Sequence, residues 1–205
     1  MKTMKKLCLS IALVLFAVSV QAQDASNRVK LLADKYKATP NYKVDITYQS
    51  SNDRMGFSNT QKGVLVVEGE KYILKFGPNE TWLNDGKTEY VGTKEEDHSQ
   101  IMYFCPGQNS EAIVDFGHLM TFYGEGHRSR IEGRTLTLTP IEETTYVQMY
   151  IETNGEDVLS LAVLDDFGTM HKYILSGFST DTAGTKFVIN PAEYEEKIYE
   201  REGCQ

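Results

Sequence analysis

Hydrophobic and polar residues alternate strictly from residue 42 to residue 49. Tyr42, Val44, Ile46 and Tyr48 fall on one side of this alternation, and the polar residues between them fall on the other. A period of two residues is typical of a β-strand that is buried on one face only. The segment is therefore predicted to be a half-buried strand, and the polar stretch after it, up to residue 60, a loop.

A helix is predicted just before this strand, over residues 25–37. Val29, Leu32 and Tyr36 recur at the spacing of one helix face, and the positions between them are mostly polar. Because proline disfavours the helical conformation in the residue before it, the helix is expected to end ahead of Pro40.

Short apolar segments joined by turns fill most of the remaining chain. Asp85-Gly86 and Asn154-Gly155 are pairs that two-residue hairpin turns favour. A succession of antiparallel hairpins commonly curls toward a barrel, since open strand edges promote aggregation. The predicted strands are residues 64–67, 72–76, 81–83, 88–91, 130–131, 135–138, 146–153, 158–164, 170–178 and 186–190.

Two further helices are predicted. Residues 111–123 carry an apolar stripe of helical period that includes Phe116, Leu119 and Met120. Residues 191–201 begin with a proline, which suits the first position of a helix. The pattern as a whole predicts a mainly β protein with some α (α+β), built on a curved antiparallel sheet.

The first 22 residues are typical of a cleaved secretory signal peptide. Lys2, Lys5 and Lys6 precede an apolar run, and Val20-Gln21-Ala22 places small residues where a signal peptidase cleaves. The run is shorter than the ~20 apolar residues of a membrane-spanning helix. We therefore expect residues 1–22 to be removed and residues 23–205 to form one exported domain.

The chain is acidic. It has 29 Asp and Glu residues against 21 Lys and Arg residues, a formal net charge of -8, and the signal peptide contributes only positive charge. An acidic surface repels nucleic-acid backbones and anionic lipid headgroups. The composition therefore excludes a nucleic-acid partner and disfavours binding to a membrane through charge.

No motif for catalysis or metal binding is present in the sequence. The histidines (His98, His118, His127 and His171) lack the His-x-x-x-His spacing of a metal site, and no Gly-x-Ser-x-Gly elbow occurs. Asp165-Asp166 falls in a predicted turn, where aspartate commonly bonds to the local backbone. We expect no enzymatic activity, no metal and no cofactor.

Two cysteines, Cys105 and Cys204, remain after the signal peptide. In an oxidising compartment they could form one disulfide bond. The alternative is that Cys105 is a small buried hydrophobic residue and Cys204 lies free in the tail.

The apolar side of the predicted sheet has two interpretations. In a small closed barrel, its side chains fill the interior completely. In a wider or unclosed barrel, they surround an apolar cavity. The period of the hydrophobic pattern is the same in both cases, so both remain open at this point.

The order of these features resembles the periplasmic outer-membrane lipoprotein carriers, the LolA-like family. The likeness runs from residues 29–48, through 63–67, 71–74 and the turn Asp85-Gly86-Lys87-Thr88, to Phe187-Val188-Ile189-Asn190-Pro191. Tyr90 stands where the family usually has tryptophan. The resemblance implies an unclosed β-barrel whose apolar cavity is covered by a helical lid.

The resemblance also implies a function, that of a periplasmic carrier that shields the acyl chains of lipoproteins and delivers them from the inner to the outer membrane. Its partners would be acylated lipoproteins, an inner-membrane lipoprotein-releasing ABC transporter and an outer-membrane acceptor, and it would act as a monomer. The expected acyl-chain cavity is lined by Val44, Ile46, Tyr48, Tyr72, Leu74, Phe76, Trp82, Tyr90, Phe116, Leu119, Met120, Met149 and Leu161.

One departure from the family lies between the predicted strands 64–67 and 72–76. Relatives often carry an Arg-Pro pair there, and its arginine holds the lid shut by hydrogen bonds. This chain has Glu68-Gly69-Glu70 instead. A second function therefore stays open: a periplasmic protein of the same fold that binds an apolar ligand or a partner without shuttling it.

Overall fold

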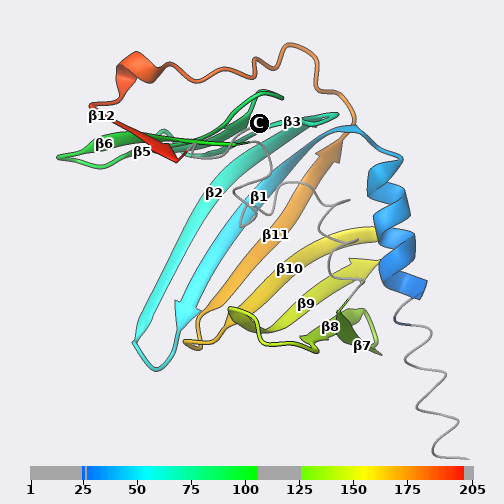
Figure 1. The fold of residues 1–205 in the computed structure, drawn as a ribbon. Helices are drawn as coiled ribbons and strands as arrows, with labels where there is room; N and C mark the ends of the chain where they lie inside the picture. Colours follow the sequence, from blue (N-terminus) through cyan, green and yellow to red (C-terminus); the bar gives the residue numbers. More distant parts are fainter. Residues whose placement is uncertain (1–24, 26, 106–125, 201–205) are drawn as a thin grey trace, which may run out of the picture.

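The computed structural model describes residues 25, 27–105 and 126–200 of the 205-residue chain. A helix over residues 25–37 comes first, and the strands follow it (Figure 1). The strands are β1 (Asn41–Asn52), β2 (Phe57–Glu68), β3 (Lys71–Phe76), β4 (Glu80–Asn84), β5 (Glu89–Lys94), β6 (Ser99–Phe104), β7 (His127–Glu132), β8 (Thr135–Pro140), β9 (Tyr146–Asn154), β10 (Asp157–Asp165), β11 (Met170–Ser179) and β12 (Glu196–Glu200), with the 3-10 helix η1 (Pro191–Glu193) before β12.

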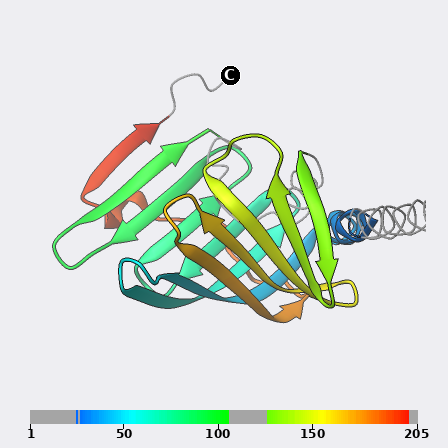
Figure 2. The same ribbon diagram turned by 90° about the horizontal axis from the view of Figure 1, so that it is seen from below.

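All of these strands belong to one 12-stranded sheet, in the order β12-β6-β5-β4-β3-β2-β1-β11-β10-β9-β8-β7. Neighbours are antiparallel except β12 and β6, which run parallel. The sheet curls strongly, yet within the described ranges its two end strands, β7 and β12, do not pair with each other (Figure 2). The predicted fold class, a mainly β protein with an unclosed antiparallel sheet, is confirmed. The predicted lid helix over residues 111–123 lies outside the described residues.

The predicted hairpin turns form because their residues suit the backbone that a tight turn requires. Asp85 Oδ1 accepts hydrogen bonds from the backbone N–H groups of Lys87 (2.8 Å) and Thr88 (2.9 Å), which closes the turn between β4 and β5. Gly155, between β9 and β10, has a φ of 63°, a backbone angle that residues other than glycine rarely adopt.

The first hairpin is longer than predicted. β1 and β2 remain paired from Asn41–Glu68 to Asn52–Phe57, so residues 50–60 are strand on both sides of a short turn and not a loop. Both faces of this part of the hairpin are largely polar, so it lacks the alternation that identifies a strand. Backbone pairing does not need apolar side chains, and Gly56, with a φ of 66°, allows the chain to reverse.

The type of secondary structure predicted for the C-terminal segments was wrong. Residues 186–190 form no strand, and the predicted helix over 191–201 is a single 3-10 turn followed by β12. Strand β6, which the pattern did not predict, supplies the edge to which β12 adds in parallel. Tertiary pairing has therefore overridden local helix preference in this acidic segment.

The two faces of the sheet carry separate apolar clusters. The concave cluster spans β1, β2, β3, β8, β9 and β10 and includes the buried face of the N-terminal helix. On the convex face, Phe187 and Ile189 of the C-terminal segment pack against Val66, Ile73 and Leu83. The C-terminal segment thus covers the outside of the sheet and leaves the inside to the N-terminal helix (Figure 1).

No helix among the described residues is long and apolar enough to span a membrane. The signal peptide predicted over residues 1–22 lies outside the described residues, so its cleavage stays a prediction.

Candidate apolar binding site

The concave face brings most of the predicted cavity residues together. Tyr48 and Trp82 are partly buried at the margin of the concave cluster and pack against it. The remaining members are buried within the cluster. The buried members are Val44, Ile46, Tyr72, Leu74, Phe76, Met149 and Leu161.

The N-terminal helix forms part of this site, which the sequence did not predict. Val29, Leu32 and Tyr36 are buried in the concave cluster, so the predicted apolar stripe of the helix faces the sheet. Next to this stripe, Lys35 forms an ion pair with Asp157, the first residue of β10. The helix is thus held to the sheet by apolar burial and by a polar contact beside it.

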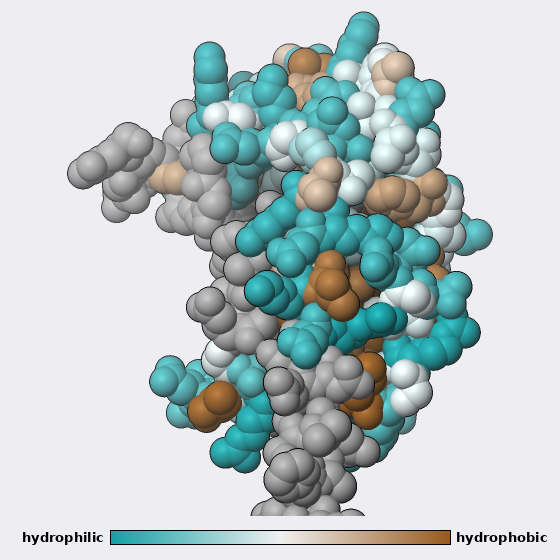
Figure 3. All heavy atoms as spheres, turned by 90° about the vertical axis from the view of Figure 1, so that its right-hand side faces the viewer, coloured by the Kyte–Doolittle hydropathy of each residue, from teal (hydrophilic) through white to brown (hydrophobic). Residues whose placement is uncertain are grey.

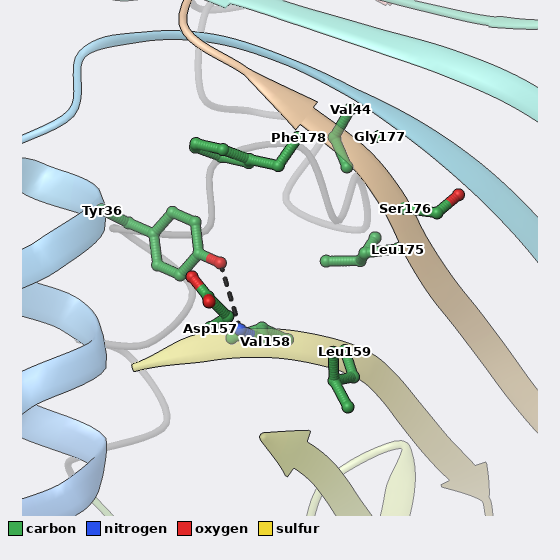
Figure 4. A pocket seen from close by; sticks show the side chains of 9 residues that line it. All are labelled: Tyr36, Val44, Asp157, Val158, Leu159, Leu175, Ser176, Gly177 and Phe178. Carbon is green, nitrogen blue, oxygen red and sulfur yellow. Dashed lines mark hydrogen bonds between the residues drawn. The ribbon is translucent and has the colours of Figure 1, made fainter. Parts of the chain in front are cut away.

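A pocket lies where β10 and β11 separate beneath this helix (Figure 4). The pairing of β10 with β11 ends at Ser160 and Ile174, whereas β11 continues along β1 as far as Ser179, past an irregularity in the register. The two strands therefore diverge and leave a space of about 190 Å³. Its lining consists of Tyr36, Val44, Asp157, Val158, Leu159, Leu175, Ser176, Gly177 and Phe178.

The walls of the pocket are largely aromatic and aliphatic. The ring of Phe178 stacks on Tyr42 at 5.5 Å between centroids and meets Tyr36 edge-on at 6.3 Å. The Tyr36 hydroxyl accepts a hydrogen bond from the Val158 N–H at 3.3 Å, which satisfies a backbone group at the strand separation. Burial raises the pKa of Tyr36, although this hydrogen bond opposes the shift, so the phenol stays neutral.

A chain of polar groups lies at the opposite margin of the concave cluster. The Tyr48 hydroxyl is 2.8 Å from His171 Nδ1, and His171 Nε2 is 3.3 Å from Asp165 Oδ2. A carboxylate accepts from Nε2, which leaves Nδ1 of a neutral imidazole to accept from the tyrosine. Burial raises the pKa of Asp165, but hydrogen bonds from Thr169 and His171 outweigh it and lower the pKa overall.

Two buried or half-buried acids lie beside aromatic members of the cluster. Trp82 Nε1 donates to Glu80 Oε1 at 2.6 Å. Burial, with a smaller effect of the Glu89 carboxylate, raises the pKa of Tyr72. The aromatic side chains therefore remain uncharged at neutral pH, and the site presents an apolar surface with polar groups at its edge.

Four predicted cavity residues do not belong to this described face. Tyr90 lies on the convex face, because its register partner Leu83 is part of the outer cluster and the tyrosine packs there as well. This corrects the prediction that Tyr90 lines the cavity. Phe116, Leu119 and Met120 lie outside the described residues, and their role stays a prediction.

Cys105 is disulfide-bonded in the structure. Cys204 lies outside the described residues, so the predicted pairing of these two cysteines is not tested directly. β12 runs parallel to β6 with Glu200 opposite Phe104, the residue that precedes Cys105.

Metal ligands do not cluster in the described part of the chain, where no three His, Cys, Asp or Glu side chains are grouped to hold an ion. His127 and His171 form hydrogen bonds with tyrosines, and His98 pairs with Glu196 at 3.2 Å.

On the helix side of the molecule the exposed surface is mostly hydrophilic, with separate hydrophobic residues between polar ones (Figure 3).

No family model and no curated protein matches the chain. Among solved structures, it is similar to a LolA superfamily protein from Nitrosomonas europaea, at 11% identity and a TM-score of 0.42 over 80% of this chain and 97% of that one. It is also similar to LprF from Mycobacterium bovis, at 15% identity and a TM-score of 0.39 over 80% and 97%. A DUF1329 family protein from Desulfovibrio piger is similar at 9% identity and a TM-score of 0.37, over 85% and 99%.

Proposed function

We propose that this protein is a periplasmic, non-enzymatic carrier that shields the acyl chains of lipoproteins against its concave face. An inner-membrane transporter would load it, and an outer-membrane acceptor would receive the cargo. The observation that carries the proposal is the pocket of about 190 Å³ between β10 and β11, which opens beside the apolar cluster beneath the N-terminal helix.

The physical demand on such a carrier is set by the hydrophobic effect. At roughly 0.8 kcal/mol per buried methylene, an acyl chain of about 16 carbons costs on the order of 12 kcal/mol to expose to water. An apolar concave face can take up part of this area. No bond is made or broken, so the function requires no catalytic group.

The pocket is smaller than the ~300–1,000 Å³ typical of a ligand site. It would therefore hold the end of one chain, and a complete chain would need the N-terminal helix to shift. The ion pair between Lys35 and Asp157, which helps to hold this helix to β10, is exposed. Exposed ion pairs contribute roughly 0–1 kcal/mol each, so part of the binding energy can open the site and favour later release.

Filling the pocket tests this proposal. Leu175 lines the pocket and is only partly buried, so Leu175→Trp adds a large ring to the space without removing a core side chain. We expect the variant to bind a dansyl-labelled fatty acid about tenfold more weakly, measured by fluorescence titration.

The matched control is Leu31→Trp, which makes the same change at an exposed position of the N-terminal helix. It should bind the probe like the unmodified protein. Equal affinities for both variants and the unmodified protein would rule the pocket out as the acyl site.

The turn Glu68-Gly69-Glu70 favours the second candidate, a binding protein without shuttle activity. Failure to pass bound probe to acceptor vesicles would select it.

A further inference from the structure

Strand β11 contains a bulge where it runs beside the start of β1. Residues 176–179 of β11 lie opposite residues 43–45 of β1, so Gly177 and Phe178 together face a single residue of β1. Gly177 has a φ of 62°, the left-handed conformation that glycine adopts at the first position of one class of bulge. Strand β11 therefore carries one residue more than its pairing with β1 requires.

The bulge changes the face of the sheet on which Phe178 lies. Leu175 packs against the concave cluster, so in a regular strand the next residue on that face would be Gly177. Phe178 would then point to the convex face. The extra residue turns it to the concave face instead, where its ring contacts Tyr36 and Tyr42.

Phe178 is the most exposed of the large apolar residues that line the pocket between β10 and β11. Tyr36, Val44 and Val158 are at most 6% exposed and Leu175 is partly buried, whereas Phe178 is 45% exposed. Its ring extends from β11 toward Tyr36 of the N-terminal helix (Figure 4).

The bulge gives this exposed ring a meaning that exposure alone does not have. A single exposed phenylalanine is ordinary on a protein surface. A bulge, however, is a built feature of a sheet, and bulges beside functional sites commonly serve to redirect a side chain. An aromatic ring that is redirected to the wall of a pocket and left half exposed there has one face available for a ligand.

We propose that Phe178 is a ligand-contacting residue of this pocket, and that a bound acyl chain packs along the exposed part of its ring. This inference rests on the proposed carrier function and adds the path of the chain. The end of the chain occupies the space of about 190 Å³, and the part that does not fit there crosses Phe178. Covering the ring removes apolar surface of both partners from water, which strengthens binding.

Titration calorimetry with lauric acid tests the inference. We expect Phe178→Ala to bind lauric acid about tenfold more weakly than the unmodified protein does. Phe178→Tyr keeps the ring and should bind within about twofold of the unmodified protein. The control is Phe167→Ala, which removes the same side chain at a 75% exposed position of the β10–β11 turn, away from the pocket lining, and should bind normally.

The variant Phe178→Trp gives a readout that a purely structural role would not change. Its fluorescence should shift to the blue when lauric acid binds, beyond any change of Trp82 in the unmodified protein, because the chain covers the exposed ring. Phe167→Trp should show no such additional shift. If Phe178→Ala does not fold, this comparison decides the question alone.

Two failures are distinguishable. Lauric acid binding that is equal in the unmodified protein, Phe178→Ala and Phe167→Ala, or an absent shift in Phe178→Trp, would overturn the role of Phe178 and leave the carrier function standing. No binding of lauric acid by the unmodified protein would overturn both.

Discussion

Replacing Asn52 with leucine is expected to lower the free energy of unfolding by about 3 kcal/mol. The buried side chain accepts two hydrogen bonds within the β1–β2 turn and donates two to the β10–β11 turn. Leucine has a similar size but makes none of these bonds. The loss therefore comes from four hydrogen bonds removed together and from the buried hydroxyl of Thr169, which loses this donor.

Chemical denaturation of the variant and the unmodified protein measures this effect. Asn59→Leu, at an exposed position of β2, is the matched control and should change stability by less than about 0.5 kcal/mol. Asn52→Asp should fall between the two, because it keeps the acceptor oxygen for Arg54 and Met55 but loses the donor. Similar stability of Asn52→Leu and Asn59→Leu would mean that the two turns are not held together by this side chain.

Gly92→Ala is expected to destabilise the protein by about 2 kcal/mol, although it adds only a methyl group. A Cβ atom at Gly92 would lie 2.6 Å from Tyr194 Cζ, which is closer than such atoms approach. Tyr194 is buried against Ile101 and Tyr103 on the convex face, just before β12. The added methyl would push the tyrosine ring out and loosen the C-terminal segment from the sheet.

A double-mutant cycle tests this cause. In the background of Tyr194→Ala the ring is absent, and Gly92→Ala should then cost less than about 0.5 kcal/mol. If Gly92→Ala is equally costly in both backgrounds, the penalty arises from β5 itself and the contact with Tyr194 is not its source.

The parts of the fold that the sequence predicts well have a strong local pattern. The alternation from Tyr42 to Tyr48 predicts both the strand and its inward face, and Val44 and Ile46 are indeed buried. The register then extends this face to Leu74 and Trp82 without further information. The N-terminal helix is predicted equally well, because its apolar residues recur with the period of an α-helix.

The sequence-based predictions are wrong where contacts between distant parts of the chain determine the local structure. Residues 196–200 carry no strand pattern and pair only because β6 offers a free edge. Tyr90 faces outward because it pairs with Leu83, which lies on the convex face. An aromatic residue fits either face, and a shift of one residue moves it from one face to the other. Even so, a turn at Asp85-Gly86 with an even number of residues keeps Tyr90 on the same face as Leu83, so counting across that turn could have placed it correctly.

The hydrophobic pattern does not predict the pocket. It depends on the separation of β10 from β11 and on the irregular register of β11 against β1 near Gly177, whose φ is 62°. It also depends on the N-terminal helix, whose Tyr36 closes one side. A glycine inside a predicted strand is the only hint of such a break, and it does not reveal what space the break creates.

Native mass spectrometry of the protein purified from its own source shows whether it carries acyl chains. The proposed carrier function predicts that the chain carries a bound species with acyl chains, either a lipoprotein or a lipid, which is lost when Leu175→Trp fills the pocket. A chain found only in its unbound mass, which after delipidation also fails to take up a dansyl-labelled fatty acid, would contradict the account.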